Sequence, residues 1–137
     1  MGKEYLIDTN AVSDFLRKAF SEEGMSFLAS VIDNIPNISV ITKIELLSFN
    51  APLEEASILE DFVINANVYE LQDDIIEETI RLRKQIKIKV PDGIIAATAL
   101  INNMTLITRN TNDFKGIAKL KTVNLHKAIP EPEKCKL

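Results

Sequence analysis

PDGIIAATALI, residues 91–101, predicts a helix whose run from Ile94 to Ile101 is apolar on nearly all sides. Pro91 and Asp92 suit the first turn of a helix, because proline fixes a helical backbone angle and an acid favours the positive helix end. A helix that is apolar all round has to be buried at the centre of a domain. The run from Thr105 to Thr108, which comes next, reads as a strand.

Strands and helices alternate on both sides of this central helix. Short apolar runs predict strands at 5–7, 38–41, 68–71, 105–108 and 122–125, and helical spacing of apolar residues predicts helices at 11–18, 25–32, 52–66 and 73–86. A further helix is expected to begin at Lys43. Thr9 or Asn10 is expected to cap the first helix, and Thr42 the third. We therefore expect an α/β fold, a three-layer α/β/α sandwich with a mostly parallel central sheet.

Composition agrees with one globular domain. The 137 residues are 46% hydrophobic and 26% charged, so the chain can bury a core without disulfides. We expect a domain over residues 1–126 and a polar tail over 127–137. The single cysteine, Cys135, favours a reducing compartment. No run reaches the roughly 20 apolar residues of a membrane span, and no signal peptide is evident, so we expect a cytoplasmic protein.

Four acids occupy similar positions in the predicted elements: Asp8, Glu45, Asp92 and Asp113. Three of them follow predicted strands, and ligand sites of parallel sheets lie beyond the carboxyl ends of the strands. Four carboxylates gathered there would repel one another unless a divalent cation neutralised them, and an all-oxygen site favours Mg²⁺ or Mn²⁺. The corresponding reaction is phosphodiester hydrolysis.

Each acid alone also has a structural explanation. Asp8 or Asp92 would more often cap a helix than bind a metal. Thr42 and Glu45 have the Thr-x-x-Glu spacing of a capping box, and Asp113 suits a loop turn. The prediction of a metal site therefore depends on the four acids together.

The same residues carry a family resemblance. Residues 7–10, Ile-Asp-Thr-Asn, together with Ser13, resemble the opening motif of PIN-domain proteins, and residues 42–45 resemble their second acidic motif. Residues 87–99 are similar to the third motif, as found in VapC toxins, and Thr108-Arg109-Asn110 with Asp113 resembles the fourth. One departure is Gly93, where these proteins commonly have alanine; it costs at most about 1 kcal/mol in a helix.

This resemblance implies an activity, site and partners. It implies an endoribonuclease in which Asp8, Glu45, Asp92 and Asp113 bind metal, and in which side chains orient these acids or the attacking water: Thr9, Asn10, Ser13 and Asn110. It also implies structured targets such as tRNA or ribosomal RNA, a homodimer, and a VapB-like antitoxin partner.

Charge and histidine content add little further information. The net charge of −4 argues only weakly against a nucleic-acid partner, because four of the 20 acids would belong to the metal site. The basic side chains that precede Asp92 could contact RNA phosphates or simply be a solvated helix face: Arg81, Arg83, Lys84, Lys87 and Lys89. His126 is expected to be an ordinary surface residue.

Two other functions remain open. A non-catalytic PIN module would bind a protein or nucleic acid without cutting it, although such a module has no need of four acids. A phosphatase or response-regulator fold also places Asp after its first strand, but residues 8–10 lack the second aspartate of those phosphatases, and the acid pair of receivers is absent.

Overall fold

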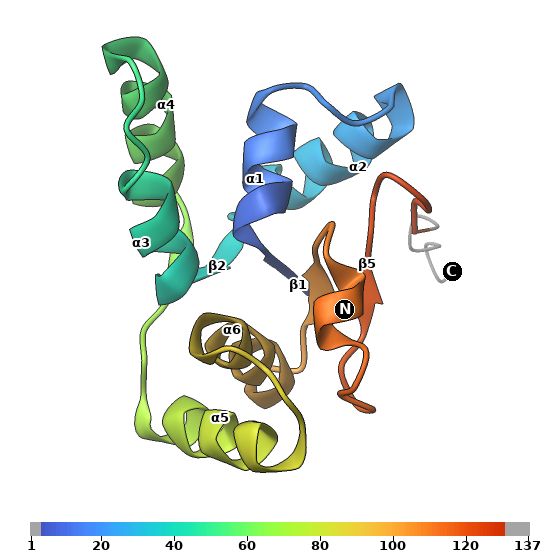
Figure 1. Cartoon of the computed structure of the whole chain (residues 1–137). Coiled ribbons are helices and arrows are strands. Elements are labelled where there is room, and N and C mark those ends of the chain that lie inside the picture. The colour runs from blue at the N-terminus through green and yellow to red at the C-terminus, as the bar shows by residue number, and fades with distance from the viewer. Residues whose placement is uncertain (1–3, 131–137) are drawn as a thin grey trace.

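The computed structural model describes residues 4–130, and this part of the chain forms one parallel sheet between helical layers (Figure 1). The strands lie in the order β3-β2-β1-β4-β5, and every neighbouring pair is parallel. Their bounds are β1 (Tyr5–Ile7), β2 (Asn37–Ser39), β3 (Asn67–Tyr69), β4 (Thr105–Ile107) and β5 (Thr122–Val123). The predicted α/β fold with a parallel central sheet is confirmed.

The helices divide between the two faces of the sheet. They are α1 (Thr9–Leu16), α2 (Glu22–Asp33), α3 (Val40–Leu47), α4 (Leu53–Ile64), α5 (Asp73–Gln85) and α6 (Val90–Ile101), with a 3-10 helix, η1, at Thr111–Phe114. Figure 1 shows α5 and α6 on one side of the sheet and α1 and α2 on the other, with α3 and α4 beside them. Alternate residues of β1 serve the two cores: Leu6 packs with α5 and α6, and Ile7 packs with α1 and α2.

Helix α6 is the buried central helix that its sequence predicts. Every residue from Gly93 to Ala99 is buried, which explains why this helix has no polar face. The helix begins one residue earlier than Pro91, with Lys89 at the N-cap position and no side-chain cap. Asp92 is therefore the third residue of the helix, and its interpretation as a cap is wrong.

Two other predicted caps are also wrong. The side chain of Asp8, rather than Thr9 or Asn10, accepts the capping hydrogen bond of α1. Ser39 caps α3 by accepting from the backbone N–H of Ile41 at 3.0 Å, so the helix starts at Val40. Thr42 consequently lies inside α3 and is fully buried, and the capping box with Glu45 does not form.

The predicted polar tail is only partly described. Residues 127–130 follow β5, and residues 131–137, including Cys135, lie outside the described part of the chain. None of the helices between residues 4 and 130 is long and apolar enough to cross a membrane.

Candidate active site

Asp8 is the most buried acid of the predicted site. It follows β1 directly and is 6% exposed, and because Ile7 pairs with Ile107, Asp8 lies beside Thr108. Its carboxylate accepts hydrogen bonds from the Thr9 N–H at 2.8 Å, the Thr108 hydroxyl at 2.8 Å and the Asn10 Nδ2 at 3.2 Å. Three donors from two segments thus fix the orientation of this carboxylate.

The pKa of Asp8 is raised above its ordinary value. Burial is the main cause, and the negative charge of Glu45 adds to it, while the hydrogen bonds from Thr108, Thr9 and Asn10 act in the opposite direction. The donors therefore only partly compensate for the cost of a buried charge. A cation bound at this place would stabilise the ionised form.

Glu45 reaches the same edge of the sheet from α3. Its carboxylate accepts a hydrogen bond from the Thr9 hydroxyl, which also lies 3.1 Å from the hydroxyl of Thr42. Because the capping box is not formed, the side chain of Glu45 is not used to close its own helix. It is exposed and directed toward Thr9, next to Asp8.

Asp92 is the residue on which the charges of the other three acids act together. Its pKa is raised, first by burial and then by the negative charges of Asp8, Asp113 and Glu45, and the positive charge of Lys89 opposes this only in part. The structure therefore brings the four predicted acids into electrostatic range of one another. They come from four separate segments of the chain.

Asp113 is the least enclosed of the four. It lies in η1, which turns back after β4, and it is exposed to solvent. The segment around Asp113, expected to be a loop turn, is thus a short 3-10 helix. Its contribution to the site is its charge, since the described structure gives its carboxylate no hydrogen-bond donor.

The chemistry of these side chains fits a hard divalent cation. All four donors are carboxylates, and the raised pKa values of Asp8 and Asp92 show negative charge that nothing in the described chain neutralises fully. The arrangement is open, however: within residues 4–130, no three acid, histidine or cysteine side chains are already gathered closely enough to hold an ion. Exposed side chains such as Glu45 and Asp113 would have to turn inward to complete a ligand sphere.

The predicted orienting residues behave differently from one another. Thr9 and Asn10 contact the acids directly, as described above. Asn110 enters the network through its backbone N–H, which donates to the Thr108 hydroxyl at 3.1 Å, and its side chain is exposed. Within the described chain, the Ser13 hydroxyl has no hydrogen-bond partner. Thr9 and Asn10 are therefore better supported as orienting residues than Ser13 and Asn110.

Sequence reasoning missed Thr108 and Asp14. Thr108 could have been found from its position, because it follows β4 as Asp8 follows β1 in the neighbouring strand.

Asp14 lies four residues after Asn10, on the same side of α1, and is 1% exposed. It accepts hydrogen bonds from Arg17, Arg109 and His126. His126, expected to be an ordinary surface residue, also packs its ring on Phe20 with 4.4 Å between centroids.

The basic stretch before Asp92 has mixed roles. Arg81 forms an ion pair with Glu78 on α5, and the Arg83 Nε donates to the Ile88 carbonyl at 3.0 Å, which supports the turn into α6. Lys89 lies close enough to Asp92 to lower its pKa. Lys84 and Lys87 are exposed. RNA contact by Arg83, Lys84, Lys87 and Lys89 stays a prediction.

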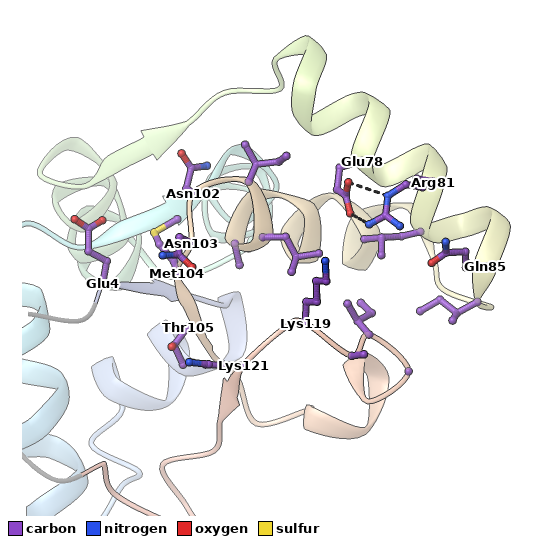
Figure 2. A pocket seen from close by; sticks show the side chains of 18 residues that line it. Glu4, Glu78, Arg81, Gln85, Asn102, Asn103, Met104, Thr105, Lys119 and Lys121 are labelled. Atoms are coloured by element: carbon purple, nitrogen blue, oxygen red, sulfur yellow. Dashed lines mark hydrogen bonds and ion pairs between the residues drawn. The ribbon is translucent and has the colours of Figure 1, made fainter.

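A cavity lies at the opposite end of the sheet, where the amino ends of the strands are found. Its volume is about 920 Å³, and it is lined by residues at the amino ends of β1 and β4 and by α5, α6 and the segment 116–121. Figure 2 shows the Lys119 side chain and the Glu78–Arg81 pair around it. Glu4 and Thr105 mark the end of the sheet where it lies, so this cavity is separate from the four acids.

Comparison with known proteins agrees with this geometry. The PIN domain family matches residues 5–120, which is most of the chain, so the protein belongs to the PIN domain family. Within that family its similarity is to solved VapBC and other toxin–antitoxin structures. No curated protein sequence matches the chain.

Three of the similar structures illustrate the relationship. A toxin–antitoxin complex from Klebsiella pneumoniae is 30% identical, with a TM-score of 0.69 over 88% of this chain and 97% of that chain. VapBC-1 from nontypeable Haemophilus influenzae is 23% identical, with a TM-score of 0.74 over 88% and 97%. DNA-bound VapBC from Salmonella typhimurium is 19% identical, with a TM-score of 0.70 over 89% and 98%. The last two show the fold alone.

Proposed function

We propose that this protein is an endoribonuclease that uses Mg²⁺ or Mn²⁺, and that it is the toxin of a type II toxin–antitoxin pair. The observation that carries the proposal is that Asp8, Asp113 and Glu45, from three other segments, lie near enough to Asp92 for their charges to add to the effect of burial in raising its pKa. Carboxylates from four segments are held together at a cost in repulsion, and a divalent cation at this edge would remove that cost. Helix capping by Asp8 and the place of Asp92 in the first turn of α6 do not by themselves require Glu45 and Asp113 at the same edge.

Asp8, Glu45, Asp92 and Asp113 would hold the cation in this proposal. When bound, a divalent cation supplies positive charge for the phosphate and activates water for attack on phosphorus. Asp8 has the firmest position, since Thr108, Thr9 and Asn10 orient it. Thr9 holds Glu45 as well, so one hydroxyl-bearing residue connects two of the acids.

The partners follow from the similar structures and from the surface. The related complexes pair a toxin with an antitoxin, and we extend this to a VapB-like antitoxin here. Exposed apolar side chains on α3, on α4 and between them provide a surface for a protein partner, either the antitoxin or a second copy in a homodimer: Ile44, Leu47, Phe49, Leu53 and Ile58. Structured RNA such as tRNA or ribosomal RNA would be the substrate, in the cytoplasm.

The test is RNA cleavage by purified protein, combined with growth after expression in a host cell. We expect cleavage with Mg²⁺ or Mn²⁺, none with chelator, and weak cleavage with Ca²⁺, whose looser coordination fixes water poorly. Asp8→Asn should abolish cleavage and relieve growth arrest, because asparagine keeps the cap of α1 but removes a charged ligand. Asp61→Asn, the same change on exposed α4, is the matched control and should remain active and toxic.

The non-catalytic PIN module is the alternative that this experiment separates. Full cleavage in excess chelator would contradict the proposed use of metal. Equal activity and toxicity of Asp8→Asn and wild type at equal abundance would contradict the proposed site. RNA binding without cleavage under any metal would favour the binding module. An adjacent gene for a small DNA-binding protein would support the antitoxin.

A further inference from the structure

A buried carboxylate on α1 is surrounded by basic side chains from three segments. The Asp14 carboxylate accepts from Arg17 Nη2 at 2.9 Å, from Arg109 Nη1 at 3.0 and 3.1 Å, and from His126 Nε2 at 2.9 Å. Arg17 follows α1, Arg109 follows β4, and His126 follows β5. We call Arg17, Arg109 and His126, together with Asp14, the Asp14 cluster.

Positive charge is in excess at the surface of the Asp14 cluster. Two arginines that are always charged face one carboxylate, and within residues 4–130 neither arginine pairs with a second acid. The side chains of Arg17 and Arg109 are 66% and 48% exposed, whereas that of Asp14 is 1% exposed. The negative charge therefore lies beneath, and the positive charge faces solvent.

The Asp14 cluster lies next to the four acids. The backbone N–H of Arg109 donates to the Asn10 Oδ1 at 2.8 Å, and the Asn10 Nδ2 donates to Asp8. Asp14 is four residues after Asn10, which is slightly more than one helical turn, or about 6 Å, along α1. An RNA strand that passes over the four acids at Asp8 can thus continue onto Arg109 and Arg17.

The shape and chemistry of the Asp14 cluster suit a phosphate group. Arg17, Arg109 and His126, with Asp14 and Ala19, line an open hollow in the surface. Guanidinium groups bind phosphate oxygens through paired N–H donors. Because the side chains of Arg17 and Arg109 are already held by Asp14, they lose less conformational entropy when they bind a phosphate. The four acids themselves repel the polyanionic RNA. A nuclease of net charge −4 therefore needs a positively charged surface beside these acids.

We propose that Arg17, Arg109 and His126 bind a backbone phosphate of the RNA close to the bond that is cut, and that Asp14 is the residue that positions them. This inference rests on the proposed function, because it supplies the substrate contact of the same site. It assigns RNA binding to a different surface from the basic stretch at residues 81–89. The cluster reads the phosphate backbone and so adds affinity without sequence preference.

The test measures binding separately from cleavage. A labelled single-stranded RNA oligonucleotide is titrated with wild-type protein in chelator at several salt concentrations. Arg17→Gln should weaken binding roughly tenfold and reduce the slope of log affinity against log salt by about 0.7, the value for one lost single-strand phosphate contact. Arg17→Lys keeps the charge and should restore most of the slope. Arg109→Gln should behave like Arg17→Gln, since its backbone contact with Asn10 survives the substitution.

Lys121→Gln is the matched control, because it removes one positive charge at the far cavity. It should leave both affinity and salt slope close to wild type. Thermal melts check folding, and should Arg109→Gln unfold, Arg17→Gln decides the result, because it loses a single exposed contact.

Two results would overturn the inference. If Arg17→Gln and Lys121→Gln bind RNA equally, the Asp14 cluster only holds the fold together. If Arg17→Gln keeps its RNA affinity but loses affinity for an antitoxin, the Asp14 cluster is a protein-docking site. Failure of the proposed function looks different: wild-type protein would then cut no RNA with Mg²⁺ or Mn²⁺, whatever the variants bind.

Discussion

Asp92 is the residue where a structural and a catalytic role can be separated most directly. It is the third residue of α6 and caps nothing, yet its negative charge lies in the favourable first turn of a helix, worth about 0.3–1 kcal/mol. Against this, burial and three neighbouring acids raise its pKa, which means that the ionised form is unfavourable in the metal-free fold. The charge of Asp92 is thus favoured by the helix end and opposed by burial and by three neighbouring acids.

Asp92→Asn should therefore lose RNA cleavage without losing stability. We expect the metal-free melting temperature to be equal to wild type or higher, and the increase caused by Mn²⁺ to be smaller, because ligand binding stabilises the native state according to affinity. Thermal melts with and without Mn²⁺, beside a cleavage assay, measure both. Retained cleavage with an undiminished Mn²⁺ shift would remove Asp92 from the site.

Burial and repulsion together give the stability of the metal-free protein a pH dependence whose sign can be stated. An acid with a raised folded pKa binds more protons when folded, so its destabilising effect is fully present above that pKa. The effect disappears as the pH falls through the folded pKa toward the ordinary value of 3.8. Asp8 and Asp92 thus both weaken the metal-free protein at neutral pH.

The four acids could be predicted from sequence, but the residues around them that make hydrogen bonds and ion pairs, Thr108 and Asp14, could not. Asp8 and Asp113 follow strands, and parallel strands end at one edge, so their proximity follows from the fold. Thr108 and Asp14 depend on the pairing of β1 with β4 and on which side of α1 faces the sheet. Neither is fixed by local composition. Their roles are decided by contacts between residues about 100 positions apart.

At the scale of single elements, helix starts were the least predictable feature. Ser39 and Thr42 are both capable caps three residues apart, and local sequence does not choose between them. Ser39 is the cap in the structure, because the pairing of β2 with β3 ends at that residue. Its hydroxyl oxygen can then accept a hydrogen bond from the Ile41 N–H. The existence and order of the predicted helices were confirmed, since apolar spacing over several turns is a stronger signal than one cap.

Gly93 in α6 is the clearest stability prediction at this scale. Alanine is favoured over glycine by about 1 kcal/mol in a helix, but a Cβ at Gly93 would lie 3.2 Å from the Thr79 Cγ2 on α5. Thr79 is stiff and held by its hydroxyl, which donates to the Ile75 carbonyl at 2.7 Å. The packing of α5 against α6 therefore opposes the gain in propensity.

Gly93→Ala alone should change the free energy of unfolding by less than about 1 kcal/mol. In a Thr79→Ser background, where the crowded methyl group is absent, the same change should stabilise by about 1 kcal/mol. Urea unfolding of the four proteins measures the difference. Equal effects of Gly93→Ala in both backgrounds would show that Thr79 does not restrict the position.

At the scale of the molecule, Asp14 joins α1 to the segments after β4 and β5. Burial alone would raise its pKa, but hydrogen bonds from His126 and Arg17 and the charge of Arg109 outweigh burial and lower it. A lowered folded pKa gives stability that is present above the ordinary value of 3.8 and lost as the pH falls through the folded pKa.

Asp14→Asn should destabilise the protein at pH 7 by roughly 1–3 kcal/mol, the range for lost hydrogen bonds to a charged group. The difference from wild type should begin to shrink below the ordinary pKa of 3.8 and disappear as the pH falls through the lowered folded pKa, where the folded wild-type carboxyl also becomes neutral. Urea unfolding across this pH range measures it, with Asp61→Asn as the control. A difference that stays constant with pH would mean that Asp14 acts through shape rather than charge.

The central place of β1 in the sheet determines when the site comes into being during synthesis. β1 is synthesised before the other strands described here, but its partner β4 begins at Thr105. The centre of the sheet therefore cannot form until a strand about 100 residues later has been synthesised. A nascent chain that stops before α6 carries Asp8 and Glu45 but neither Asp92 nor Asp113, and Asp8 still lacks its donor Thr108. A product that stops before α6 therefore lacks two of the four acids of the proposed site and should cut no RNA.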